Sequence, residues 1–132
     1  MAETDFTEFL AKWHHMVEQR DLARIDDFLT EETELCSPAF WTPKKGRAYV
    51  GTVLRAVVSG VENFRYTGEW AGDGRLVLEF QGEVGGVALK GIDIISLDAE
   101  GRIARIEVLV RPMNGLAAIA EMVKGAFARP MV

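Results

Sequence analysis

The sequence predicts an α+β fold in which helices come first and an antiparallel sheet follows. Up to residue 59, apolar side chains recur every three or four positions, which is the spacing of amphipathic helices. From residue 63 onward apolar and polar side chains alternate, as in strands that have one face in a core. A strongly twisted sheet with helices on one side wraps into a cone, whose inner face is either a packed core or a ligand pocket.

The first half of the chain is predicted to form three helices and one short strand. Helices are expected over residues 4–21, 22–32 and 47–59, because each of these segments carries one apolar stripe. The strand is expected over residues 33–37, where Pro38 ends it. An irregular connection then leads to the third helix.

The second half of the chain is predicted to form a sheet and a last helix. Turns that contain glycine separate four strands. The strands are expected over residues 63–70, 75–84, 87–97 and 102–113. Asn114 is then expected to cap a C-terminal helix. A chain of 132 residues has the size of one domain, so residues 1–132 are expected to form a single one.

The composition limits the partners and the setting of the protein. The formal net charge is −5 and no basic stripe is present, so we expect no nucleic-acid partner. The lone Cys36 excludes an intrachain disulfide and a cysteine-rich metal site, and no metal or cofactor is expected. The start of the chain is acidic, and no stretch approaches the roughly 20 apolar residues of a membrane span. We therefore expect a soluble, cytoplasmic protein without membrane contact.

Four stretches of the chain follow the order of the expected elements: "RDLARIDDFLTEETELCSP", "GRAYVGTVL", "GIDIISLDAEGRIARIEV" and "VRPMNGL". In this order they resemble the nuclear-transport-factor-2-like superfamily, which includes the SnoaL-like polyketide cyclases and the ketosteroid isomerases. The resemblance covers nearly the whole chain and implies a cystatin-like cone with a C-terminal helix. Its motifs are loose, so it bears on the fold more than on the chemistry.

The isomerase branch of this superfamily implies three polar residues inside the cone. These are a tyrosine on the first helix, an aspartate before the proline that ends the first strand, and a protonated aspartate on the strand before the "GRI" turn. Carried onto this chain, the three positions fall on Trp13, Ser37 and Lys90. The epoxide-hydrolase branch places an arginine two positions before the residue that is Asp93 here, and this chain has Gly91. The resemblance therefore argues against both mechanisms in their usual form.

Lys90 is the most informative candidate for a functional residue. Strict alternation places it on the inner face together with Ala88, Ile92 and Ile94. A lysine inside an apolar cone is costly unless it is paired or its pKa falls, so Lys90 is expected to anchor a carboxylate or an enolate-like oxygen. The alternative is a lysine that reaches the cone mouth, or one that a bulge at Gly91 turns outward.

Ser37 and His14 complete the set of catalytic candidates with Lys90. A Ser-Lys pair would give Ser37 a nucleophilic role, and a local hydrogen bond at the strand end is the alternative. His14 lies one step from the inward Trp13, where it is either an acid–base group or an ordinary surface histidine. The residues expected to line a ligand site are Trp13, Val17, Ser37, Phe40, Trp41, Val53, Leu78, Phe80, Lys90, Val108 and Val110.

The stretch "ELCSPAFWTPKKGR" frames the expected mouth of the cone. Phe40 and Trp41 are expected at this mouth, and the cations Lys44, Lys45 and Arg47 are expected to draw an anion towards it.

The outer face of the sheet is expected to be half apolar, with charges of both signs, which is typical of an interface between two copies of a chain. A homodimer is therefore predicted, and an ordinary solvated face is the alternative. The residues assigned to this interface are Glu79, Asp93, Ile95, Glu107, Leu109 and Arg111. A register slip that turns Asp93 and Glu107 inward would give them a functional role instead.

Three functions agree with these patterns. The first is binding of a small, mainly apolar ligand with a polar, acidic or enolate-like end in the cone of a homodimer. The second is an enzyme of the polyketide-cyclase, isomerase or dehydratase type with a non-standard polar set. The third is a dimerisation module whose cone is filled.

Overall fold

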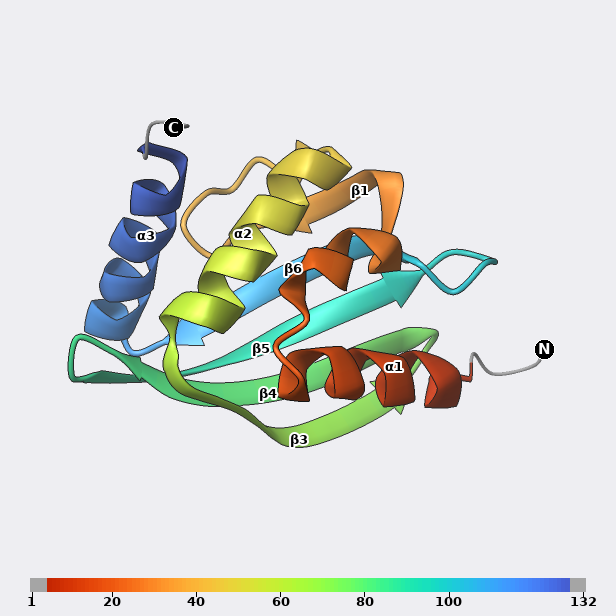
Figure 1. The fold of residues 1–132 in the computed structure, drawn as a ribbon, viewed down its shortest axis with the longest axis horizontal. Helices are drawn as coiled ribbons and strands as arrows, with labels where there is room; N and C mark the ends of the chain where they lie inside the picture. Colours follow the sequence, from red (N-terminus) through yellow and green to blue (C-terminus); the bar gives the residue numbers. More distant parts are fainter. Residues whose placement is uncertain (1–4, 129–132) are drawn as a thin grey trace.

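The protein has an α+β fold, as predicted, and the computed structural model describes residues 5–128. The elements in chain order are α1 (Thr7–Glu18), the 3₁₀ helix η1 (Leu22–Phe28), β1 (Leu29–Cys36), β2 (Lys44–Lys45), α2 (Arg47–Gly60), β3 (Glu62–Gly72), β4 (Arg75–Val84), β5 (Val87–Leu97), β6 (Ile103–Arg111) and α3 (Met113–Ala128) (Figure 1). Within residues 5–128, no helix has both the length and the apolarity that a membrane span requires.

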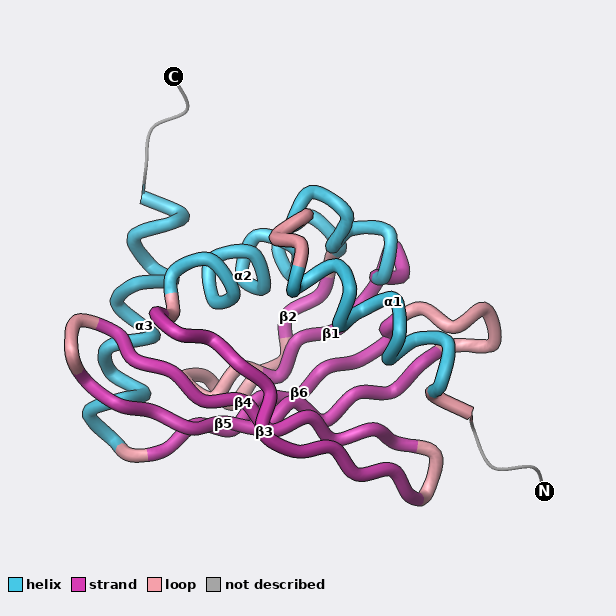
Figure 2. Tube along the Cα trace, turned by 60° about the horizontal axis from the view of Figure 1, so that its bottom comes forward, coloured by secondary structure: helices cyan, strands magenta, loops and turns pink. Residues whose placement is uncertain are grey.

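A single curved sheet forms one wall of the molecule. Its six strands lie in the order β2-β1-β6-β5-β4-β3. Neighbouring strands run antiparallel, except that β1 and β6 are parallel. The helices α1, η1 and α2 cover the concave face, and α3 packs against α2 and the strands β4 to β6 (Figure 2). The predicted cone with a C-terminal helix is therefore confirmed.

Two apolar clusters hold the helices to the sheet. The larger one joins the buried faces of α1, η1 and α2 to the sheet and includes Trp13, Leu54 and Ile95. Burying the apolar stripes of these helices removes their side chains from water, which is the main stabilising contribution to the fold. A smaller cluster, Val61, Phe80, Leu89 and Ile119, attaches α3. Tyr66 and Val108 pack against both clusters.

The elements around β1 differ from the prediction. The second helix ends at Phe28 as a 3₁₀ helix, and the strand begins at Leu29 rather than at residue 33. Pairing of Leu29 with Ile103 of β6 and the burial of Leu29 outweigh the helical stripe. The short strand β2 was not predicted, and it pairs Lys44 with Leu35 of β1.

The C-terminal helix begins one residue earlier than predicted. Asn114 lies in the first turn of α3, which starts at Met113, and it is therefore not the residue that caps the helix. At the other end of the chain, the predicted first helix includes Thr4, which lies outside the described residues.

The predicted inner face of β5 is wrong. Lys90 lies on the outer face of the sheet, where its ammonium is 3.9 Å from the Glu79 carboxylate. The pairing of β4 with β5 is continuous from Leu76 to Val84, so no bulge at Gly91 causes this orientation. The buried residues of β5 are Leu89, Gly91, Asp93 and Ile95. Both faces of β5 are rich in apolar residues, so the alternation within this strand alone does not distinguish them.

Two of the six residues assigned to the predicted interface do not lie on the outer face of the sheet. Asp93 and Ile95, which were assigned to it, face the concave side and are 7% and 0% exposed. Leu109 is 47% exposed, and it lies between Glu107 and Arg111 on the outer face of β6. Glu107, Leu109, Arg111 and Glu79 do lie on the outer face of the sheet, where the prediction placed them.

We predict that Gly91→Ala destabilises the fold by about 1–3 kcal/mol, because a methyl group at this position forces its close neighbours to move. A Cβ atom at Gly91 would collide with the Phe80 ring and lie 2.7 Å from the backbone oxygen of Leu109. The matched control is Gly72→Ala, where a Cβ atom meets nothing within 4 Å. Urea unfolding of both variants checks this prediction, and equal stabilities of the two variants would contradict it.

Candidate functional site

A cavity of about 580 Å³ occupies the cone between the helices and the concave face of the sheet. Its walls are mainly apolar and come from α1, α2, α3 and the strands of the sheet. This volume lies within the range of small-molecule sites, about 300–1,000 Å³. The cone is therefore not filled, which removes the third of the functions considered from the sequence.

Asp93 is the buried carboxyl of this cavity. It projects from β5 into the wall and is 7% exposed. Within residues 5–128 it forms no ion pair, and no hydrogen bond joins its carboxyl to another group. Burial disfavours the charged form and raises the pKa of Asp93 to about 7. Near neutral pH the carboxyl is therefore present in both its protonated and its ionised form.

Tyr66 places a phenol in the same cavity. The indole N–H of Trp13, which is 1% exposed, donates a hydrogen bond of 2.7 Å to the Tyr66 hydroxyl oxygen. Burial of the hydroxyl, and secondarily the charge of Asp93, raise the pKa of Tyr66, so the phenol keeps its proton. Because its oxygen already accepts a bond from Trp13, the hydroxyl proton is available to an acceptor in the cavity. A hydroxyl that accepts one hydrogen bond is also a stronger donor of the next.

Ser37 contributes no base to the cavity. Its hydroxyl oxygen accepts a hydrogen bond of 3.0 Å from the Ala39 N–H, so the local hydrogen bond considered from the sequence is present. Lys44, Glu121 and Lys124 are the charged residues at the open end of the cavity, and all three are exposed. The cavity thus has buried polar groups at Trp13, Tyr66 and Asp93, and free charges only where it meets solvent.

Most of the residues expected to line a ligand site surround this cavity. Those that do are Trp13, Ser37, Phe40, Val53, Phe80, Val108 and Val110. Leu78 is 0% exposed and lies in the core, while Trp41 is 98% exposed and does not line the cavity. Lys90 lies on the opposite face of the sheet, so its expected role as the anchor of a ligand oxygen is wrong.

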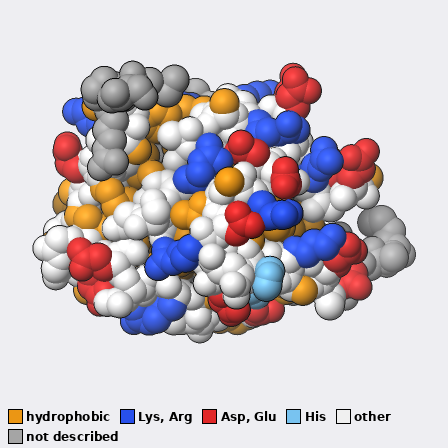
Figure 3. Space-filling model, viewed as in Figure 1, with side chains coloured by type: hydrophobic (Ala, Val, Ile, Leu, Met, Phe, Trp, Pro, Cys, Tyr) orange, Lys and Arg blue, Asp and Glu red, His pale blue; other side chains and the backbone are white. Residues whose placement is uncertain are grey.

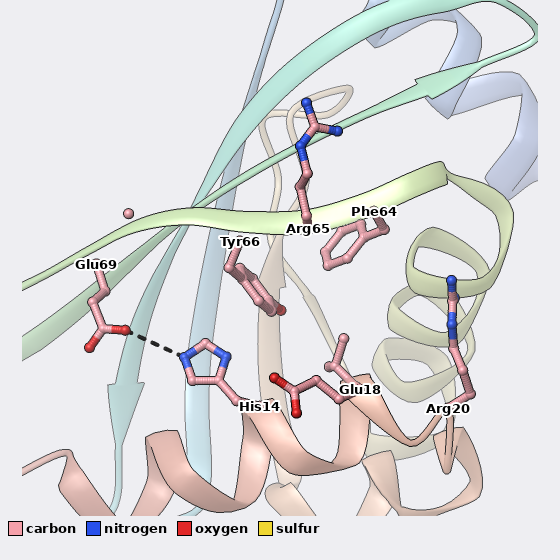
Figure 4. A pocket seen from close by; sticks show the side chains of 9 residues that line it. His14, Glu18, Arg20, Phe64, Arg65, Tyr66 and Glu69 are labelled. Carbon is pink, nitrogen blue, oxygen red and sulfur yellow. Dashed lines mark hydrogen bonds and ion pairs between the residues drawn. The ribbon is translucent and has the colours of Figure 1, made fainter.

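His14 and Val17 belong to a different hollow, which lies outside the cone between α1 and β3 (Figure 4). There the His14 imidazole is 3.4 Å from the Glu69 carboxylate. The rings of Phe64 and Tyr66 line both this hollow and the cavity, so they form the wall between them. The outer hollow has a similar volume, about 590 Å³, but it contains no buried charged group. The cone cavity is therefore the better candidate for a working site.

The prediction from sequence missed Tyr66 and placed Asp93 on the wrong face. The signal for Asp93 lies in the hairpin between β4 and β5. The two-residue loop Gly85–Gly86 fixes the register, so that Phe80 pairs with Gly91 and Leu78 with Asp93. Because paired residues share a face, the apolar face of β4 identifies the inner face of β5. No comparable signal distinguishes Tyr66 from other aromatic residues of β3.

We predict that Asp93→Asn changes how stability depends on pH. The pKa of Asp93 rises from 3.8 to about 7 on folding, so between these values the folded state binds more protons than the unfolded state. The contribution of Asp93 to the free energy of unfolding is fully present below pH 3.8 and is lost as the pH rises through 7. The loss amounts to as much as about 4 kcal/mol. Asparagine removes this loss, so urea unfolding should show Asp93→Asn more stable than the wild type at pH 8. A variant less stable than the wild type at pH 8 would contradict the prediction.

Comparison with known proteins agrees with this architecture. A steroid delta-isomerase from Pseudomonas aeruginosa is 37% identical, with a TM-score of 0.88, over 96% of this chain and 93% of that chain. A protein with a cystatin-like fold from Silicibacter pomeroyi is 28% identical, with a TM-score of 0.80, over 88% of this chain and 82% of that chain. An NTF2-like protein of unknown function from Mesorhizobium loti shares the fold, with 15% identity, a TM-score of 0.70, and coverage of 84% of this chain and 98% of that chain.

No protein-family model matches the sequence, and no curated protein does. The similarity to the solved structures nevertheless extends over nearly the whole chain, and one of them exceeds 30% identity. Together with the curved sheet and the open cone, it shows that the chain belongs to the nuclear-transport-factor-2-like/SnoaL-like superfamily and has its ligand-binding cone fold.

Proposed function

We propose that the protein is an acid–base enzyme that moves a proton within a small, mainly apolar carbonyl compound bound in the cone. The observation that carries this proposal is the buried carboxyl of Asp93, which has no partner in the described chain and shares an apolar cavity with the Tyr66 hydroxyl. A general base is most effective when its pKa lies near the working pH. Asp93 meets that condition, since its pKa is about 7.

The proposed reaction needs only these two groups. The ionised form of Asp93 removes a proton from the carbon beside the carbonyl, and the electron pair of the C–H bond moves so that the carbonyl oxygen becomes an enolate. Tyr66 donates its hydroxyl proton as a hydrogen bond to this oxygen, where negative charge develops. The protonated Asp93 then returns its proton to the same carbon or to a conjugated one. Atoms and charge balance without a co-reactant.

Trp13 has a positioning role in this reaction. Its N–H holds the Tyr66 oxygen at 2.7 Å, which limits rotation of the phenol and directs its proton away from the indole. In the isomerase branch, the position of Trp13 would carry the tyrosine itself. Here the phenol comes from β3, and the helix residue supports it.

The steroid delta-isomerase that is 37% identical to this chain supports proton-transfer chemistry of the isomerase type. The distribution of roles differs, however, because Ser37 stands where the isomerase branch has its base and is used in a local hydrogen bond. Asp93 is the only buried carboxyl among the described residues of the cavity, so it takes the role of the base.

A second candidate function is ligand binding without a reaction. The local hydrogen bond of Ser37 favours it, because Ser37 stands where the isomerase branch has its base and contributes no base here. In this case the protonated form of Asp93 donates a hydrogen bond to a ligand oxygen. The two functions differ in the form of Asp93 that is active, so they depend on pH in opposite directions. Catalysis increases as pH rises through about 7, whereas binding to the protonated carboxyl weakens over the same range.

We predict that the protein catalyses exchange of the α-hydrogens of 2-tetralone, an apolar bicyclic ketone, in D₂O. The rate, followed by NMR, should rise with pH and level off above about 7, because the carboxylate of Asp93 is the base. Asp93→Asn should lose about 10²–10⁴-fold in rate, which is the usual size of a general-base contribution. Tyr66→Phe should also lower the rate, since it removes the donor to the enolate oxygen.

Lys90→Met is the matched control for these variants, because Lys90 lies on the outer face of the sheet. It should leave the exchange rate unchanged. Binding of 2-tetralone with no exchange above the buffer rate would reject the enzyme and leave the binding function. A rate that Asp93→Asn does not lower would show that another group is the base.

We also propose that two copies of the chain associate through the outer face of the sheet. This face carries the cations Lys90 and Arg111 and the carboxylates Glu79 and Glu107, with the apolar Leu109 among them. Charges of both signs around an apolar centre suit an interface in which the same patch meets itself across a two-fold axis.

We predict that Leu109→Arg weakens such a dimer by about tenfold or more, since it places two like charges at the centre of a two-fold interface. Sedimentation analysis over a range of concentrations measures the effect. Trp41→Arg is the control, because Trp41 is exposed but lies in the loop after β1. A wild-type protein that sediments as a monomer would reject the dimer.

A further inference from the structure

We propose that Lys44, at the mouth of the cone, binds an anionic group at the far end of the ligand from its carbonyl. The ligand would then be a small apolar acid that carries its carboxylate at the mouth and its reactive carbonyl beside Tyr66 and Asp93. The carbonyl end of this description rests on the proposed function. The anionic end rests on the contacts of Lys44 and on the other charges that line the cavity.

Lys44 is held over the mouth by its backbone and by two aromatic rings. It pairs with Leu35 across the β1–β2 ladder, and its side chain lines the cavity. Its ammonium nitrogen lies 5.0 Å from the centre of the Phe40 ring and 5.2 Å from the centre of the Tyr49 ring. A cation within about 6 Å of a ring face is attracted to it. Lys44 is therefore restrained before a ligand arrives, which lowers the entropy lost on binding.

The Lys44 ammonium forms no ion pair within the described residues. Among residues 5–128 no carboxylate lies within ion-pairing distance of it, although the chain carries five more acidic than basic residues. Aromatic rings attract a cation without neutralising it, so the ammonium can still bind an anion. The described chain thus has a cation without an acidic partner at the mouth of its mainly apolar cone cavity, although its net charge is negative.

The other two cations of this stretch do not share this position. Lys45 is exposed and does not line the cavity. Arg47 donates a hydrogen bond of 3.2 Å to the backbone oxygen of Leu29. Of the three cations expected to draw an anion, Lys44 is the one whose side chain borders the cavity.

The other charged residues that line the cavity determine the orientation of an acidic ligand. At the mouth, Lys44 and Lys124 outnumber the single carboxylate of Glu121. At the buried wall, the carboxyl of Asp93 would repel a second anion, and burying an unpaired charge there would be costly. A ligand with one carboxylate therefore lies with that group at the mouth and its apolar body inside.

The rim around Lys44 also offers apolar surface to such a ligand. Tyr49 stacks on Phe127 of α3 with ring centres 5.1 Å apart, so the rim joins the loop after β1, α2 and α3. Phe40 and Phe127 are 59% and 46% exposed. Hydrophobic side chains gather on the surface between α2 and α3 (Figure 3). The ligand's body would cover rings that otherwise face water.

Two fluorescent probes that differ by one charge test this proposal. 8-Anilinonaphthalene-1-sulfonate carries a permanent anion in place of the carboxylate, and N-phenyl-1-naphthylamine is the same aromatic body without it. Dissociation constants of both probes are measured for the wild type, Lys44→Met and Lys45→Met, together with displacement of the neutral probe by the anionic one. Methionine keeps most of the length of the lysine side chain and removes its charge.

We predict that Lys44→Met weakens binding of the anionic probe roughly threefold relative to binding of the neutral probe, as expected for a partly exposed ion pair. The preference of the wild type for the anion should also fall with added salt. Lys45→Met, the adjacent and also exposed control, should behave as the wild type.

Three results would overturn the proposal. The first is that Lys44→Met loses affinity for both probes equally. The second is that Lys44→Met and Lys45→Met lose affinity for the anionic probe equally. The third is that the anionic probe fails to displace the neutral one. The measurement does not involve hydrogen exchange, so its result is independent of the proposed enzyme. Intact exchange of 2-tetralone with no preference for the anion would reject Lys44 as a specificity determinant and nothing more.

Discussion

The register of the β4–β5 hairpin determines which side chains enter the cone. Gly85 and Gly86 both have positive φ, at 56° and 82°, which is the backbone that a tight two-residue hairpin loop requires and that glycine adopts without strain. A shift of one residue would turn every side chain of β5 to the opposite face. Lys90 would then enter the apolar wall and Asp93 would reach solvent. The loop glycines do not line the cavity themselves, but they keep Asp93 on its wall.

The same register sets a conflict between stability and the proposed function. Opposite Leu78, an apolar residue would pack well, but Asp93 stands there without a cation or a hydrogen-bond donor in the described chain. A domain of this size has only about 5–15 kcal/mol of net stability, so a buried, partly ionised carboxyl uses a large share of it. Close packing elsewhere in the fold, such as the ring of Phe80 against Gly91, contributes stability that offsets this cost.

Sequence reasoning identified the elements well and the cavity less well. The helices and the strands of the meander follow apolar periods that burial on one face imposes. The strand β1 began earlier than expected because pairing with β6, distant in the chain, competes with a local helical stripe. Phe40 and Trp41 are neighbours in one loop, yet only Phe40 lines the cavity, since an irregular backbone has no period from which to read direction. The cavity volume depends on how far the helices stand from the sheet, which no local pattern records.

The sheet order has a consequence for how the chain folds as it is synthesised. β1 pairs in parallel with β6, so the strand at residues 29–36 lacks its main partner until residues 103–111 have left the ribosome. Contacts between such distant segments form late and slowly, because the long intervening loop must first be ordered. The hairpins of β3, β4 and β5 need no such wait. The N-terminal helices and β1 therefore remain open to chaperones and proteases until the last strand arrives and closes the cone.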